Sequence, residues 1–127
     1  MTSDKKRVTK SHRDLDVWKR SVELITFIYD VTKSFPKEEI YGITNQVRRA
    51  AVSIPSNISE GAARHHNKEF IQFLYISFGS ISELETQIII CENLKFLVIT
   101  DSTKIQNELT ELRKMILGLI RHLESKN

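Results

Sequence analysis

The sequence contains few of the residues that tight turns, disulfides and membrane spans require. Only four glycines and two prolines occur among 127 residues, which disfavours a sheet-rich chain with many turns. A single cysteine, Cys91, excludes an intrachain disulfide and a cysteine-rich zinc site, and its apolar surroundings predict a small buried side chain. No apolar run approaches the roughly 20 residues that cross a bilayer, and no secretory signal follows the start. We therefore expect a cytoplasmic protein.

Catalytic constellations are equally scarce. The sequence has no glycine-rich phosphate loop and no serine in a nucleophile elbow. His65 and His66 are adjacent, so on a helix they would point about 100° apart and make poor joint metal ligands. Glu83 and Glu85 are separated in the same way, and the Glu-x-x-His motif of two-metal bundles is missing. We predict no enzymatic activity, no cofactor and no metal site.

Positive charge is concentrated at the N-terminus. The chain carries a net charge of +3, yet residues 1–13 alone hold five Lys/Arg and one Asp, a local +4. The remainder therefore carries a net −1. We expect residues 1–13 to be a basic flexible tail and residues 14–127 to form one folded domain. Such a tail, with Lys5, Lys6 and Arg7, either adds phosphate affinity by releasing counterions or only aids solubility.

Hydrophobic periodicity predicts a first helix from about Asp14 to Ser34. Asp14 would cap its N-terminus, and Pro36 would end it because proline disfavours helical geometry at the preceding residue. Residues at three- and four-residue spacing form its predicted buried stripe: Leu15, Trp18, Val22, Ile25, Ile28 and Thr32.

A second helix is predicted from about Ile43 to Ala63, with Pro55 inside it. Its buried side is rich in small residues, which favours close approach of its neighbours: Val47, Ala50, Ala51, Ile54, Ile58 and Ala62. Proline removes one backbone hydrogen bond and clashes with the preceding turn. We expect either a kink near residues 51–55 or two helices that meet there, with Ser53 as the cap of the second.

The third predicted helix, from about Asn67 to Leu94, is apolar on two faces. One face carries Phe70, Phe73 or Leu74, Ser77, Ile81, Leu84, Ile88 and Cys91. The other carries Ile71, Tyr75, Phe78 and Ile89. A helix of this kind must be covered on two sides, which four helices in one small monomer rarely achieve. We therefore expect the second face to mediate self-association into a homo-oligomer.

The fourth predicted helix follows the stretch "ITDSTK", in which Asp101 or Ser102 would act as its cap. Steps of four and three give it a coiled-coil-like seam: Ile105, Leu109, Leu112, Ile116, Leu119 and Leu123. Because the connections are short, consecutive helices should pack antiparallel. The predicted fold is all-α, an antiparallel up-down-up-down four-helix bundle.

A polar stripe on the second helix admits two interpretations. Helical spacing groups the following side chains, with Arg48 at their flank: Gln46, Arg49, Ser53, Asn57, Glu60 and Arg64. In the structural interpretation, Glu60 pairs with Arg64 at i, i+4 or with Arg49 of a neighbouring subunit. Ser53 and Asn57 would then satisfy backbone carbonyls around Pro55.

In the functional interpretation, the same region is a phosphate-binding patch. Arg48, Arg49, Arg64 and Lys68 would supply the charge, and planar guanidinium groups can contact phosphates in pairs of hydrogen bonds. Between residues 44 and 69 only two carboxylates, Glu60 and Glu69, oppose them. Aromatic residues for base stacking are absent from that span.

Three blocks of sequence carry a family resemblance. They are "DLDVWKRSVELITFIYDVTKSFP", "EIYGITNQVRRAAVSIPSNISEGAAR" and "EFIQFLYISFGSISELETQIII". Together they resemble the four-helix bundle proteins encoded within intervening sequences of 23S ribosomal RNA genes. The resemblance covers residues 14 to about 97, and the fourth helix matches only as an amphipathic pattern.

The resemblance implies an antiparallel four-helix bundle similar to ring-forming homopentamers, with no established activity in most members. A related branch resembles the accessory variability protein of diversity-generating retroelements, in which a basic pentamer binds nucleic acid and a reverse transcriptase. This chain departs from that branch, because it has a net charge of −1 outside residues 1–13.

Two functional hypotheses follow. The first is a non-enzymatic, homo-oligomeric module that binds RNA or another nucleic acid through the basic tail and the Arg48, Arg49 and Arg64 region. The alternative is a protein–protein interaction adaptor, whose arginines form internal contacts and which binds no nucleic acid.

Overall fold

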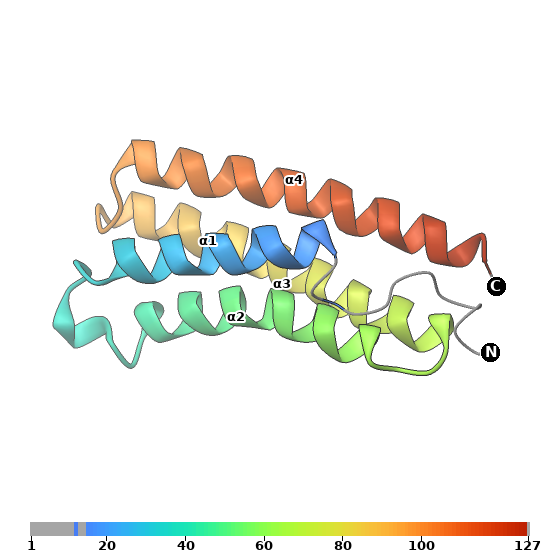
Figure 1. Cartoon of the computed structure of the whole chain (residues 1–127). Coiled ribbons are helices and arrows are strands. Elements are labelled where there is room, and N and C mark those ends of the chain that lie inside the picture. Colours follow the sequence, from blue (N-terminus) through green and yellow to red (C-terminus); the bar gives the residue numbers. More distant parts are fainter. Residues whose placement is uncertain (1–11, 13–14, 127) are drawn as a thin grey trace.

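The computed structural model describes residue 12 and residues 15–126 and contains four helices (Figure 1). These are α1 (Asp16–Thr32), α2 (Ile43–Ala62), α3 (Asn67–Asn93) and α4 (Ile99–Glu124). A short 3₁₀ helix, Lys37–Glu39, lies in the connection between α1 and α2. Consecutive helices run in opposite directions and pack against each other, and α1 also packs against α4. The predicted antiparallel bundle is confirmed, with α1 and α3 diagonally opposite.

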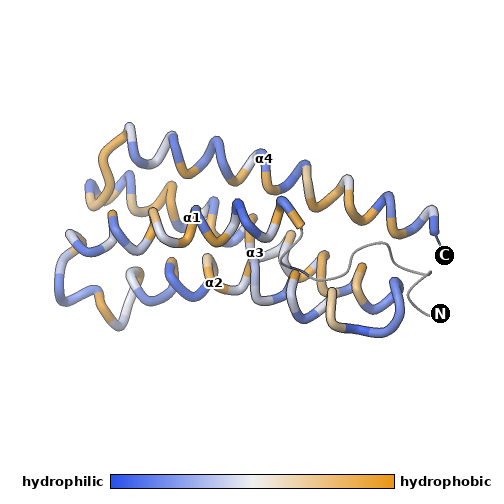
Figure 2. The backbone as a smooth tube through the Cα atoms, viewed as in Figure 1, coloured by the Kyte–Doolittle hydropathy of each residue, from blue (hydrophilic) through white to orange (hydrophobic). Residues whose placement is uncertain are grey.

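The core runs along the bundle axis. Polar and apolar residues alternate in short runs along each helix (Figure 2), as expected when one side of a helix faces the core. The largest completely buried side chains come from all four helices: Phe70, Ile28, Ile54, Ile58, Leu74, Ile81, Leu84, Ile88, Ile105, Leu109, Leu112 and Ile116. Cys91 is also buried, as predicted.

The buried stripe of α1 differs from the predicted one. The buried residues are Val17, Ser21, Leu24, Ile28 and Thr32, whereas Val22 is exposed and Trp18 and Ile25 are only partly buried. Apolar residues occur all around α1, so the three- and four-residue periodicity could not distinguish the buried face from the apolar face beside it. Leu15 occupies the N-cap position. Asp14, the predicted cap, lies outside the described residues.

Pro55 is accommodated inside one helix, so the two-helix alternative is wrong. α2 continues through Pro55, whose side chain is buried. The predicted core positions Val47, Ala50, Ala51, Ile54 and Ile58 are buried, and the sixth, Ala62, is only partly buried.

The predicted core face of α3 is confirmed, with Leu74 rather than Phe73 in the buried position. The second apolar face differs from the predicted one, because Ile71 and Phe78 are partly buried against the core. The exposed apolar residues of α3 are Tyr75 and Ile89, as predicted, together with Ile76 and Ile90, and they are between 41% and 51% exposed.

The start predicted for α4 is wrong. The helix begins at Ile99 with Val98 as its N-cap, so Asp101 and Ser102 lie inside the first turn. Ser102 is buried there, and its hydroxyl donates to Glu92 Oε1 at 2.6 Å instead of capping the helix. Near the C-terminus the seam passes through Ile120 rather than Leu119, which is only partly buried.

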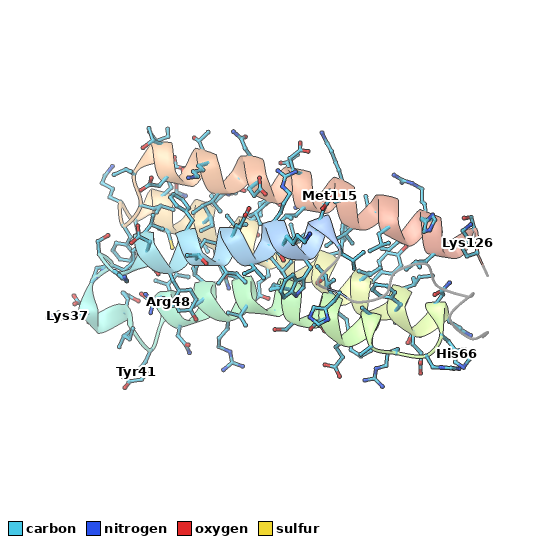
Figure 3. The ribbon with its side chains drawn as sticks, viewed as in Figure 1. Lys37, Tyr41, Arg48, His66, Met115 and Lys126 are labelled. Carbon is cyan, nitrogen blue, oxygen red and sulfur yellow. The ribbon has the colours of Figure 1, made fainter. Side chains whose placement is uncertain are left out.

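The connections between the helices are divided between the two ends of the bundle. The α2–α3 turn and the end of α4 lie at one end (Figure 1), which we call the α2–α3 end, and the shorter α1 starts part-way along the bundle. The α1–α2 and α3–α4 connections lie at the other. Figure 3 shows His66 and Lys126 at the α2–α3 end and Lys37 and Tyr41 at the opposite end.

Candidate nucleic-acid interface

Arg48 is held against α1. Its Nε donates to the Thr32 hydroxyl at 2.9 Å, and an Nη donates to the Tyr29 carbonyl at 3.5 Å. The guanidinium carbon lies 4.6 Å from the centroid of the Tyr29 ring, a cation–π distance. These contacts tie α2 to the C-terminal part of α1. They also occupy hydrogen-bond donors that the phosphate interpretation needs.

Arg49 points into solvent. It is exposed, and within the described part of the chain it has no hydrogen bond or ion pair. Beside it lies an open depression of about 590 Å³, lined by residues of α1 and α2: Tyr29, Asn45, Arg48, Arg49, Val52, Ser53, Ser56, Asn57 and Glu60. A phosphate reaching this depression would meet an unpaired guanidinium.

Arg64 follows the end of α2, and its charge is partly neutralised. It forms an ion pair with Glu60 at 3.0 Å, the i, i+4 pair predicted from the sequence. Its guanidinium also lies 4.8 Å from the centroid of the Phe73 ring on α3. Lys68 in the first turn of α3 is exposed, with no ion pair among the described residues.

The four predicted residues of the folded domain do not converge. Arg49 lies in α2 and Arg64 lies just after the C-cap of α2, fifteen positions further along. At the α-helical rise this separation corresponds to roughly 22 Å. A single phosphate therefore cannot contact both, although an extended polyanion can. Lys5, Lys6 and Arg7 lie outside the described residues, so their role stays a prediction.

The side chains of Ser53 and Asn57 form hydrogen bonds with backbone carbonyl groups near Pro55, as the structural interpretation predicted. Ser53 Oγ is 3.1 Å from the Ala50 carbonyl and also bonds to Ser80 Oγ of α3. Asn57 Nδ2 donates to the Ser53 carbonyl at 2.8 Å. The sequence pattern had no means to identify Ser80 as a partner, because Ser80 comes from a different helix.

A second, larger depression of about 890 Å³ lies between α1 and α4. Arg20 spans it with two hydrogen bonds to Glu108, at 2.7 and 2.8 Å, and the hydrogen bond to Glu108 raises the pKa of Arg20. Lys104 Nζ lies 4.0 Å from the centroid of the Phe27 ring. The main cations of this depression are thus already engaged within the chain.

Other chemistry is limited in the described residues. Among them, no group of three His, Cys, Asp or Glu side chains is placed to hold a metal ion. Burial, with a smaller contribution from Glu39, raises the pKa of the Cys91 thiol to about 11, which disfavours the reactive thiolate. None of the described helices has the length and apolar character to span a membrane.

Comparison with known proteins decides the family. The model of the 23S rRNA-intervening sequence protein family matches residues 13–118. The chain belongs to this family. The resemblance inferred from the sequence is thereby confirmed, and the match to the 23S rRNA-intervening sequence proteins extends into α4, beyond the predicted limit near residue 97.

A solved structure supports the fold of this 23S rRNA-intervening sequence protein. The chain is similar to the crystal structure of a protein with unknown function from the S23 ribosomal protein family of Bacteroides thetaiotaomicron VPI-5482. The TM-score is 0.76 at 24% identity, and the similarity covers 83% of this chain and 95% of that chain. The comparison with curated proteins gives no match.

Proposed function

We propose that this protein is a non-enzymatic, homo-oligomeric scaffold that binds structured RNA or another nucleic acid. The observation that carries the proposal is the presence of two exposed cations, Arg49 and Lys68, without an ion pair among the described residues, on a domain that is otherwise nearly neutral. The basic residues 1–13 add a local +4. Cations of this kind bind phosphates through counterion release, without base contacts.

The outer face of α3 supports self-association. Tyr75, Ile76, Ile89 and Ile90 form an exposed apolar strip that continues to Leu94, which is 52% exposed. Between Gln72 and Leu94 this part of α3 carries little exposed charge: Glu83 is exposed, and the half-exposed Glu85 is paired with Arg113 of α4 at 3.0 Å. Exposed apolar surface with so little charge is typical of subunit interfaces. The resemblance to ring-forming homopentamers favours five subunits.

An oligomer would make weak phosphate contacts effective. Each subunit offers few free cations, but several copies present the same cations to one RNA molecule. Linked copies then bind with an avidity that exceeds the affinity of one copy by orders of magnitude.

The engaged state of Arg48 favours the alternative, a protein–protein interaction adaptor. A guanidinium that bonds to Thr32 and Tyr29 acts first as a structural tie. Under this alternative, the apolar face of α3 would meet another polypeptide and the chain would bind no nucleic acid.

Matched substitutions of the two adjacent arginines separate these functions. We expect Arg49→Ala to weaken binding of a fragment of ribosomal RNA several-fold and to leave the thermal midpoint of unfolding unchanged, because Arg49 has no partner in the described chain. Arg48→Ala should lower that midpoint, because it removes the hydrogen bonds between α2 and α1. The expected loss in the free energy of unfolding is about 1 kcal/mol. Fluorescence anisotropy at two salt concentrations, with melting curves, measures both.

The salt dependence provides the control. Affinity that falls steeply with salt and is reduced by Arg49→Ala supports the RNA scaffold. RNA affinity that is absent, or unaffected by Arg49→Ala and by salt, overturns it and favours the adaptor.

A further inference from the structure

The depression beside Arg49 contains an aromatic ring that α2 does not supply. No Phe, Tyr or Trp occurs between residues 44 and 69. The packing of α1 against α2 nevertheless brings Tyr29 into the lining of the depression, and Figure 3 shows Arg48 between the same two helices. Tyr29 is 39% exposed. Part of its side chain is therefore open to a molecule that enters from solvent.

Arg48 extends this aromatic surface and is itself held in place. Its guanidinium carbon lies over the Tyr29 ring, 4.6 Å from the centroid, and its Nε donates to the Thr32 hydroxyl at 2.9 Å. The hydrogen bond fixes the orientation of the planar guanidinium group. Nucleobases stack on tyrosine rings and on guanidinium planes alike. Tyr29 and Arg48 therefore form a stacking surface that is ordered before a ligand binds.

Groups that can recognise a phosphate and the edge of a base surround this surface. Arg49 lines the depression and has no ion pair within the described residues, so its guanidinium is available to a phosphate. Asn45 and Ser56 also line it and are exposed, and amide and hydroxyl groups bond to base edges. The carboxylate in the lining, Glu60, is paired with Arg64 at 3.0 Å, which reduces its repulsion of an anion.

The depression also has a suitable size. Its volume is about 590 Å³, within the range of roughly 300 to 1,000 Å³ that is typical of small-ligand sites. Val52, which is 40% exposed, adds an apolar part to the lining and favours contact with the face of a base. Aromatic, cationic and amide groups in one depression match a nucleotide better than an inorganic phosphate, which has no ring to stack.

We propose that this depression binds one unpaired nucleotide of an RNA, with the base against Tyr29 and Arg48 and the adjoining phosphate at Arg49. The proposal rests on the RNA binding put forward under Proposed function and names the kind of RNA that the site selects. A base in a duplex is paired and stacked and cannot enter the depression, whereas a base in a loop, bulge or single strand can. Contacts to phosphates alone do not make this distinction.

The test compares two RNA ligands with the same number of phosphates, a hairpin with an unpaired loop and a blunt-ended duplex. We expect the full chain to bind the hairpin roughly tenfold more tightly at the same salt concentration, because only an unpaired base can stack on an aromatic side chain. Tyr29→Leu should remove this preference and leave the affinity for the duplex unchanged. Tyr29→Phe should retain the preference, since it keeps the ring. Arg49→Ala should weaken the binding of both ligands.

A fluorescent base reports the stacking directly. The adenine analogue 2-aminopurine, placed in the hairpin loop, loses emission when it stacks, so binding of the parent protein should quench it. At saturating protein the quenching should be much smaller with Tyr29→Leu. Tyr75→Leu is the matched control, because it removes another partly exposed tyrosine, 50% exposed, on α3 and outside the depression. It should retain both the hairpin preference and the quenching.

Equal affinity of the parent for hairpin and duplex, or quenching that Tyr29→Leu does not reduce, overturns this inference while RNA binding stands. If the parent binds neither RNA, the proposed function itself is wrong. Melting curves check that Tyr29→Leu folds, as expected for a partly exposed residue whose carbonyl still accepts from Arg48. Quenching by the parent needs no variant, so its absence overturns the inference even if Tyr29→Leu does not fold.

Discussion

At the scale of the residue, Cys91 shows how position determines chemistry. Its side chain is completely buried on the inner face of α3, and burial raises its pKa to about 11 from an ordinary value of 9.0. The native state therefore binds the thiol proton more tightly than the unfolded state does. A structural role follows, because a thiol held in this form is a poor nucleophile and a poor metal ligand.

This difference predicts a loss of stability at high pH. Well below pH 9 the Cys91 thiol is protonated in the native and in the unfolded state, and its full contribution to the free energy of unfolding is present. This contribution, roughly 2 to 3 kcal/mol, is lost as the pH rises from 9 to about 11. Urea titrations across this range should show a smaller decline for Cys91→Ala than for the parent protein. An identical decline in both would mean that other groups cause it.

Arg48 and Arg49 show how far the sequence predicts a site. Both were expected in one basic patch, and adjacent positions on a helix differ by 100° in direction. One reaches Thr32 on α1 and the other reaches solvent. Composition and spacing found the candidate cations. They could not tell which were engaged, because Tyr29, Thr32 and Phe73 are brought to them only by the packing of other helices.

At the scale of the element, α2 and α3 depend on a close approach at Gly61. A methyl group built on Gly61 would lie 2.7 Å from Phe73 Cβ, 2.8 Å from Phe70 Cδ1 and 3.2 Å from the Phe70 carbonyl oxygen. Two of these contacts are with carbon atoms close to the backbone or inside the core, so neither can move freely. The helices could not keep their present separation with any larger residue there.

Substitution of glycine by alanine should therefore have opposite effects at two positions. Gly61→Ala should destabilise the protein by about 1 to 3 kcal/mol through overpacking. Gly118→Ala in α4 adds a methyl group that meets nothing within 4 Å, and should stabilise the helix by roughly 0.5 to 1 kcal/mol. Chemical denaturation of both variants measures the two effects. A stable Gly61→Ala variant would show that α2 and α3 can separate at little cost.

The sequence predicted the elements better than their faces. Four helices were correctly located because strong three- and four-residue periodicity covers each of them. The buried stripe of α1 was predicted correctly at Ile28 and Thr32, but its N-terminal half was placed on a neighbouring face, because Val17 and Leu24 rather than Val22 and Ile25 enter the core. The start of α4 was placed too late, because Ser102 was expected to cap the helix and instead bonds to Glu92 on α3.

At the scale of the whole molecule, the uncovered face of α3 is the main feature that a single bundle leaves unexplained. The core is complete without it, since the opposite face of α3 contributes Leu74, Ile81, Leu84 and Ile88 to the interior. A further apolar strip on the outside adds nothing to the stability of one chain in water. Contact with another copy would bury it.

A charge in this strip should therefore change assembly and leave folding intact. We expect Ile76→Asp to lower the molar mass measured by light scattering on a sizing column, because an unpaired carboxylate in an interface is costly. Its helical circular dichroism should be retained, since Ile76 is 51% exposed. Tyr41→Asp is the matched control. Tyr41 is 93% exposed and lies at the other end of the molecule from the α2–α3 turn, so this variant should keep the parent mass.

If Ile76→Asp and the parent have the same mass, another surface joins the subunits or the chain is a monomer.

The placement of the helix ends also affects how the protein can be joined to others. Because α4 ends at the α2–α3 end (Figure 1), a partner fused to the C-terminus is tethered beside the α2–α3 turn and would obstruct that region. A circular permutant, with the present ends joined by a linker and new ends opened in the connection that contains Lys37–Glu39, would carry its fusion partner at the opposite end. Such a permutant is the appropriate form for immobilising the protein while that region stays accessible.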